Sequence, residues 1–233
     1  MATRTSSSGH RERPSAEATA KPKRRTRERI LETSLRLFND FGEPNVTTQL
    51  IADEMEISPG NLYYHFHSKD EILEAIFADF EGRIGQTLAA PARGMARVED
   101  IWDFLRLLFD HIWTYRFLYR DLHDLVSRNR IVETHFKQIL AHKMRTAAQI
   151  CEDLVTTGEM KPTSRAELQT LAVNMTVLAT HWLSFEFVRN PRQAMDEAAL
   201  MRGAYHVMSL AAPYLDGRAL ELYRKMSGQY AAA

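Results

Sequence analysis

The stretch TTQLIADEMEISPGNLYYHFHSK, residues 47–69, decides the fold that this sequence predicts. It reads as two short helices joined by a tight turn. Ser58 is the expected N-cap of the second helix, and Pro59 follows at its first position, where a missing N–H costs no hydrogen bond. In the first helix Leu50, Ile51 and Met55 are assigned to one buried face. The pattern is typical of a helix-turn-helix.

The second helix of this stretch has an outward face without a carboxylate. At about 100° per residue, Leu62 and Phe66 point inward, whereas Gly60, Asn61 and Tyr64 point outward. Amide and phenol groups beside a glycine suit close approach to a phosphate backbone and to base edges. We therefore expect this helix to recognise nucleic acid.

The segment from Arg27 to Leu73 resembles the DNA-binding domain of the TetR family of bacterial transcriptional regulators. One departure lies in the turn, where Met55 and Glu56 stand in place of the family's usual Ala-Gly, so the turn must reach a positive φ without glycine. The matching residues are Ile30, Leu31, Leu37, Phe38, Gly42, Thr47, Thr48, Ile51, Ala52, Ile57, Ser58, Gly60, Leu62, Tyr63, Tyr64, His65, Phe66, Ser68 and Lys69.

The resemblance and the helical wheel together predict which side chains meet DNA. Thr48 and Tyr63 are expected to bind phosphates, and Lys69 to add a charge contact. Asn61 and Tyr64 are the best candidates to touch base edges, while His65 could equally form a structural hydrogen bond. The predicted DNA-binding residues are Thr48, Gln49, Ser58, Gly60, Asn61, Tyr63, Tyr64, His65 and Lys69.

Composition bounds the class of protein. The chain has 233 residues, of which 45% are hydrophobic and 26% charged, as in ordinary soluble proteins with a substantial core. The single cysteine, Cys151, excludes an internal disulfide and fits a reducing compartment. Since no apolar run reaches membrane-spanning length and the N-terminus has no hydrophobic signal-peptide core, we expect a cytoplasmic protein without membrane contact.

Charge and helical periodicity divide the chain into three parts. Residues 1–29 carry nine Lys or Arg against three Glu, which predicts a basic, disordered arm over residues 1–25; contact between this arm and DNA is left open. A DNA-binding domain with its connecting helix is expected over residues 26–89, its first helix starting at Thr26. A helical regulatory and dimerisation domain is expected over residues 90–230, with no strand, so the fold class is all-α.

Several boundaries inside these domains are predicted from caps and breakers. Ser68 with Glu71, and Ser164 with Glu167, form the sequence pattern of a capping box at the start of a helix. Helices are also expected over residues 117–127 and 131–157, the second ended by Gly158.

Two functional surfaces are predicted in the second domain. Aromatic and Met side chains, with a few polar groups, are expected to enclose a mainly apolar effector, an expectation that the family resemblance supports. The candidate pocket residues are Trp102, Phe109, Trp113, Phe117, His123, Phe136, Met175 and Trp182. A second apolar stripe on the last long helices is expected to form a homodimer, and its residues are Ala172, Thr176, Ala179, Leu200, Gly203, Ala204, Val207, Met208 and Ala211.

These patterns favour a ligand-responsive repressor that binds a palindromic operator as a homodimer. An activator of the same fold, or an all-α protein-interaction module, remains as the alternative. The segment 115–122 resembles a subgroup linked to polyhydroxyalkanoate and fatty-acid metabolism, which suggests an acyl-type effector. Nucleotide-binding and hydrolase motifs are absent from the sequence, so neither an enzyme nor a cofactor or metal is expected.

Overall fold

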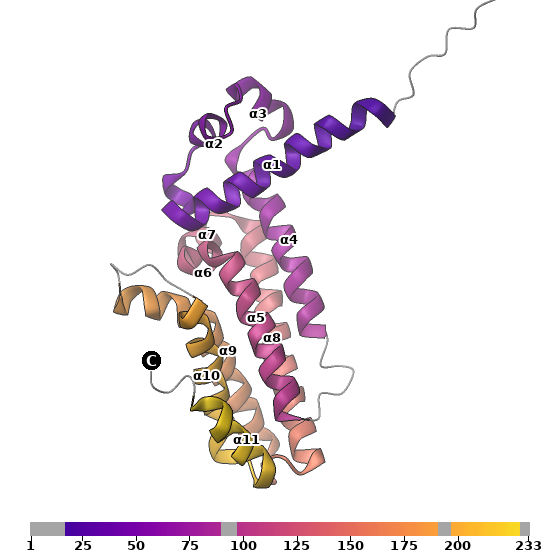
Figure 1. The fold of residues 1–233 in the computed structure, drawn as a ribbon, viewed down its shortest axis with the longest axis vertical. Helices are drawn as coiled ribbons and strands as arrows, with labels where there is room; N and C mark the ends of the chain where they lie inside the picture. Colours follow the sequence, from indigo (N-terminus) through magenta and orange to yellow (C-terminus); the bar gives the residue numbers. More distant parts are fainter. Residues whose placement is uncertain (1–16, 90–96, 191–196, 229–233) are drawn as a thin grey trace, which may run out of the picture.

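The computed structural model describes residues 17–89, 97–190 and 197–228. Within these ranges all regular secondary structure is helical, apart from one isolated bridge between Met160 and Leu215, and this confirms the all-α prediction. Figure 1 shows an elongated molecule in which the first helices of the chain form a cap at one end of a long bundle.

The cap contains the first helices of the chain, and a long helix leads from it into the bundle. Val46, Ile51, Leu62 and Phe66 form its core with residues of the first helix, and all are at most 2% exposed. The elements are α1 (Glu17–Phe41), η1 (Glu43–Asn45), α2 (Thr48–Glu54), α3 (Pro59–His65) and α4 (Lys69–Ala89).

The bundle is formed by the far part of α4 and by the helices that follow it (Figure 1). Its longest members, α8 and α9, pack against each other, and α10 packs on α9 and α5. The elements are α5 (Val98–Thr114), α6 (Arg116–Arg120), α7 (Leu122–Arg128), α8 (Arg130–Thr157), α9 (Arg165–Arg189), α10 (Glu197–Ala211), η3 (Ala212–Tyr214) and α11 (Gly217–Ser227).

The first helix begins at Glu17, so the prediction that it starts at Thr26 was wrong. Ala, Glu, Lys and Arg are strong helix formers, and a helix anchored in the core extends readily into such a sequence. Part of the predicted arm over residues 1–25 is therefore helical, and residues 1–16 lie outside the described residues. The helix ends before Gly42, whose φ of 89° breaks the helical path.

Local capping explains the other boundaries. Ser58 Oγ accepts a hydrogen bond from the Asn61 N–H at 3.2 Å, which confirms its predicted N-cap role. The capping box of Ser164 and Glu167 is complete. At Ser68 only half of the predicted box forms, because the Glu71 carboxylate accepts from the His67 N–H instead.

Two predicted features of the helices were wrong. The expected helix over residues 117–127 is divided at Asp121 into α6 and α7, and this carboxylate accepts a hydrogen bond from the Glu43 N–H at 3.0 Å. Leu50 is 37% exposed, whereas Ile51 and Met55 are buried. Since Ile51 and Met55 are one turn apart, Leu50 is rotated away from the face that they share.

Candidate nucleic-acid interface and ligand cavity

The outward face of α3 is built as the wheel predicts. Leu62 and Phe66 are at most 2% exposed, whereas Tyr63 and Tyr64 are 46% and 64% exposed. Gly60 and Asn61 are also exposed, and a Cβ added to Gly60 would meet no atom within 4 Å. The backbone at the start of α3 is therefore open to close approach from outside.

Hydroxyl groups from α2 and α3 meet at the edge of this face. Thr48 Oγ1 and Tyr63 Oη share a hydrogen bond of 3.2 Å, so the two predicted phosphate ligands lie together and one of their two O–H groups is left to donate outward. Gln49 lies one position further along α2, where its Nε2 donates to Asp53 Oδ1 at 2.7 Å. This bond leaves the second N–H and the carbonyl oxygen of the Gln49 amide available for other partners. Ser58 is occupied by its N-cap role, and His65 is partly buried with its ring against Tyr64.

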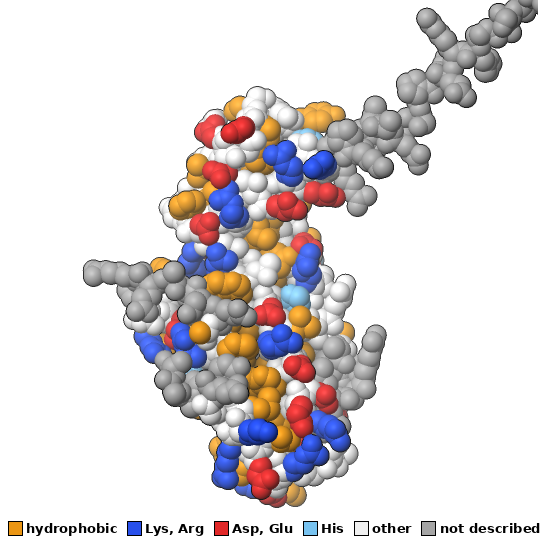
Figure 2. All heavy atoms as spheres, in the orientation of Figure 1, with side chains coloured by type: hydrophobic (Ala, Val, Ile, Leu, Met, Phe, Trp, Pro, Cys, Tyr) orange, Lys and Arg blue, Asp and Glu red, His pale blue; other side chains and the backbone are white. Residues whose placement is uncertain are grey.

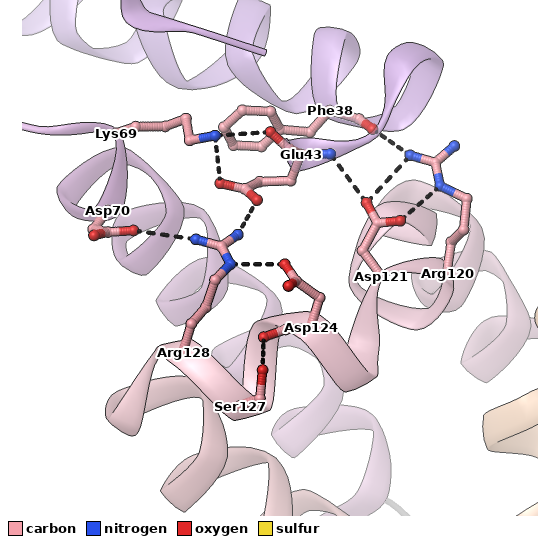
Figure 3. Close-up of polar contacts among 9 residues, drawn as sticks. All are labelled: Phe38, Glu43, Lys69, Asp70, Arg120, Asp121, Asp124, Ser127 and Arg128. Atoms are coloured by element: carbon pink, nitrogen blue, oxygen red, sulfur yellow. Dashed lines mark hydrogen bonds and ion pairs between the residues drawn. The ribbon is translucent and has the colours of Figure 1, made fainter. Parts of the chain in front are cut away.

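Lys69 is not a free surface cation, and its predicted charge contact with DNA would compete with an ion pair inside the chain. Its Nζ donates to the Glu43 carbonyl oxygen at 3.0 Å and lies 3.1 Å from Glu43 Oε1. Glu43 is fully buried, and its other carboxylate oxygen accepts from Arg128 of α7 (Figure 3). Because a buried carboxylate needs this compensation, Lys69 serves the joint between the cap and the bundle.

Arginines of α1 supply positive charge close to α3, although none of them was among the predicted DNA-binding residues. The Arg27 guanidinium lies 4.7 Å from the centroid of the Phe66 ring, which places it beside the end of α3. Arg25 and Arg29 are exposed on the same helix. Figure 2 shows Lys and Arg side chains where α1 passes below the helix-turn-helix. The excess of basic residues before residue 30 was the sequence signal, although it was assigned to a disordered arm.

The bundle encloses an apolar cavity of about 50 Å³. Helices α4, α5, α8, α9 and α10 all contribute to its wall. The lining residues are Leu88, Ile101, Phe104, Leu105, Leu108, Lys143, Thr146, Ala147, Ile150, Cys151, Leu154, Met175, Thr176, Ala179, Val207, Met208 and Ala211.

Of the predicted pocket residues, only Met175 lines this cavity. The rings pack elsewhere, because large aromatic side chains fill space and a void remains where smaller ones converge. Phe117 packs on Phe38, and Phe136 packs on Tyr119. The Trp113 ring lies under the Arg116 guanidinium, and the His123 ring lies beside that of His181. Trp182 donates a hydrogen bond to the Ala199 carbonyl oxygen, while Trp102 and Phe109 are buried in the core. Small residues such as Ala147, Cys151 and Ala179 line the cavity, and their clustering is the sequence feature that could have indicated its position.

Cys151 and Lys143 are the titratable groups of the cavity wall. Burial, followed by the nearby Glu152 charge, raises the pKa of the Cys151 thiol to about 12, so it stays protonated. Burial also lowers the pKa of the Lys143 ammonium to about 7. The cysteine therefore acts as a small apolar group.

The predicted dimer stripe faces the interior of the chain. Each of its residues is buried in a single copy, so none can form a surface between two copies. Gly203 shows the reason, because a Cβ there would lie 2.4 Å from Phe109 and 2.6 Å from Trp182. Small residues on this stripe allow α10 to approach α5 and α9. The stripe residues are Ala172, Thr176, Ala179, Leu200, Gly203, Ala204, Val207, Met208 and Ala211.

Similarity to known proteins agrees with this architecture. Residues 30–76 match the profile described as "Bacterial regulatory proteins, tetR family", and residues 79–223 match "Bacterial transcriptional repressor" of the same family. The second match alone covers more than half of the chain. The chain belongs to the TetR family.

Solved and curated relatives extend this assignment. The structure of a TetR-family regulator from Marinobacter aquaeolei VT8 is 32% identical, with a TM-score of 0.80, covering 88% of this chain and 98% of that one. The repressor KstR2 of Mycolicibacterium smegmatis is 25% identical over 70% of this chain and 79% of its own length. The probable regulator YttP of Bacillus subtilis is 24% identical over 58% of this chain, and the matched region covers 65% of the length of YttP. The TetR-family chain is thus a helix-turn-helix transcription regulator.

Proposed function

We propose that this protein is a ligand-responsive repressor that binds a palindromic operator as a homodimer in the cytoplasm. The observation that carries the proposal is the course of α4. Leu88, near its last residue, lines the cavity, and Lys69, its first residue, contacts the cap that carries α3. A helix of 21 residues is about 30 Å long, so α4 connects the two candidate sites directly.

The helix-turn-helix supports DNA binding through two kinds of contact. The Thr48 and Tyr63 hydroxyls, with Arg27 nearby, are placed to bind phosphates and set the register of the protein on the duplex. Asn61 and Tyr64 are exposed on the open face of α3, where base edges of a major groove could be reached. We assign base readout to these two side chains.

The cavity supports effector binding that changes the shape of the bundle. Pockets for drug-sized ligands measure roughly 300–1,000 Å³, so a cavity of about 50 Å³ must enlarge to accept one. Thr146 on its wall donates from Oγ1 to the Leu88 carbonyl oxygen at 3.0 Å. An effector that displaces Thr146 would release the last turn of α4. A mainly apolar effector, acyl compounds included, fits the lining.

The joint between cap and bundle would transmit this movement. Glu43 binds Lys69 of α4 and Arg128 of α7, and its backbone N–H donates to Asp121 (Figure 3). Because these contacts fix the cap on both α4 and α7, a shift of α4 would rotate the cap and its recognition helix. Two recognition helices that are no longer about 34 Å apart would not fit successive major grooves.

A homodimer is supported by the outer face of α9. Val173, Val177 and Val188 lie within about 60° of one another on the helical wheel, and each is at least 44% exposed. Phe185 and Phe187 are also exposed on this helix. Among the described residues α9 is long and apolar enough to cross a membrane, with 44% of its apolar window buried. We attribute its excess apolar surface to a partner copy.

The test is a binding selection with random duplex DNA, followed by titration of the selected operator. Wild-type protein should select a palindrome, and its affinity should fall steeply with salt. Asn61→Ala should lose about 1–3 kcal/mol at one base position in each half-site, because an Asn amide discriminates between base edges. Anisotropy with single-position operator variants measures this loss.

Gln138→Ala is the matched control, since Gln138 is an exposed amide on α8, far from α3 in the chain. It should retain the wild-type selection profile. Absence of any selected sequence for the wild-type protein would refute the proposed function. An unchanged profile for Asn61→Ala would remove only this residue from base readout.

A further inference from the structure

Lys143 is a buried lysine whose side-chain stem lines the proposed effector cavity, while its ammonium is turned toward Tyr119 and Thr180. The residue is 4% exposed and lies on α8 among the lining residues. Its Nζ donates to Tyr119 Oη at 3.2 Å and to Thr180 Oγ1 at 3.5 Å, and lies 4.9 Å from the centroid of the Tyr119 ring. Both acceptors are uncharged, and a lysine ammonium has a third N–H to donate.

Other buried charges in the described residues are neutralised, which makes Lys143 unusual. Glu43 has Lys69 and Arg128 as cationic partners, and Glu186 has Arg189 and Arg202. For Lys143 the described part of the chain offers no carboxylate within ion-pair distance. A buried charge without a counter-ion is costly, so a position that keeps one suggests that the counter-ion comes from outside.

The surroundings of Lys143 add positive rather than negative potential. His181 follows Thr180 on α9, and its ring lies 6.3 Å from that of His123 on α7. The pKa of His181 is lowered first by burial and then by the nearby basic groups His123 and Lys143. An anion bound at this place would favour the charged forms of Lys143 and His181.

We propose that the effector is an amphipathic anion, with an apolar chain in the cavity and a carboxylate that binds Lys143. This inference rests on the proposed function, because it names the chemical class of that effector. The aliphatic side chains of Ile101, Leu108, Ile150 and Leu154 suit a hydrocarbon chain. The carboxylate would accept the free N–H of Lys143 and supply the missing counter-charge.

The test compares octanoate with 1-octanol, which share a hydrocarbon chain and differ in charge. Calorimetric titration of the full-length protein at about pH 6.5 should show octanoate binding at least about tenfold more tightly than octanol. Lys143→Met keeps the length of the side chain but removes the charge. In this variant the preference for octanoate should disappear, while octanol still binds.

Lys137→Met is the matched control, because Lys137 lies on the same helix, is 70% exposed and pairs with Glu133. It should keep the wild-type preference for octanoate. Lys143→Gln provides a second variant if the methionine variant does not fold, and it should lose the preference too. Equal binding of the two probes by wild-type protein, no binding of either, or a preference that persists without Lys143 would overturn the inference. Operator selection, measured separately, decides the proposed function.

Discussion

Glu56 holds the turn of the helix-turn-helix in a conformation that favours glycine. Its φ of 54° is the only positive value among the described non-glycine residues. The left-handed conformation costs an ordinary residue roughly 1–2 kcal/mol, because its Cβ approaches the neighbouring carbonyl oxygen. The sequence comparison with the family predicted a positive φ without glycine at this turn, and the backbone confirms it.

Replacing Glu56 with glycine should therefore stabilise the protein. Glu56→Gly removes the Cβ and should raise the free energy of unfolding by about 1 kcal/mol, partly offset by the greater freedom of glycine in the unfolded chain. Urea denaturation measures the change. Operator affinity should stay the same or become tighter.

Glu56→Ala separates backbone strain from charge, because it removes the carboxylate and keeps the Cβ. This variant should show no gain in stability. A large loss of operator affinity in both variants would mean that the carboxylate takes part in binding, contrary to our interpretation of the turn.

Residue-level inference succeeded where a pattern is local and failed where partners are distant. Ser58, Leu62 and Phe66 were placed correctly because capping and helical periodicity act within one turn. Lys69 was predicted to contact DNA, but its partner Glu43 is 26 residues away in η1. No spacing rule connects these two positions, so only the folded chain shows that the cation is occupied.

At the scale of elements, α9 and α10 have more than one apolar face, and periodicity could not decide which one is buried. Their small residues were assigned to a dimer surface. In the folded chain Gly203 instead lies against Phe109 and Trp182. Small residues permit close helix packing within one chain as well as between two chains, so the choice between the faces depends on the packing of the whole bundle.

Gly203→Ala should destabilise the bundle. The added methyl group would overlap two aromatic side chains, and forced repacking of this kind costs typically about 1–3 kcal/mol. Thermal and urea unfolding measure the loss.

Gly82→Ala in α4 is the matched control, because a Cβ there meets nothing within 4 Å. It should stabilise the protein by roughly 0.5–1 kcal/mol through helix propensity. A neutral Gly203→Ala would contradict the packing that we describe between α10 and its neighbours.

For the whole molecule, the outer face of α9 determines the proposed assembly. Val177→Asp places a charge at a position that is 55% exposed in one copy and covered in the proposed dimer. The dimer should dissociate, since burying an unpaired carboxylate is costly. Light scattering coupled to gel filtration measures the mass, and operator affinity should fall with it.

Ile131→Asp is the corresponding control, because Ile131 is 46% exposed on α8. The variant should remain dimeric. A monomeric wild-type protein, or a dimeric Val177→Asp variant, would show that α9 does not form the interface.

The overall architecture was predictable, but the position of the cavity was not. Strong periodicity and caps defined the helices of both domains. A void, in contrast, depends on which side chains fail to fill the space between helices, and Ile150 and Leu154 line it although nothing distinguishes them from core residues in the sequence. The aromatic side chains were predicted to line the pocket, but most of the predicted ones fill space elsewhere in the bundle.

The small size of the cavity has a consequence for the speed of regulation. An effector larger than about 50 Å³ needs a wider cavity, and we expect the bundle to open before such an effector is fully bound. Once the effector is abundant, the rate of release from DNA would equal the rate of opening and would not rise further with concentration. The rate at which the bundle opens would then determine how soon a cell responds after the effector appears. This rate depends on the packing of α4, α5, α8, α9 and α10.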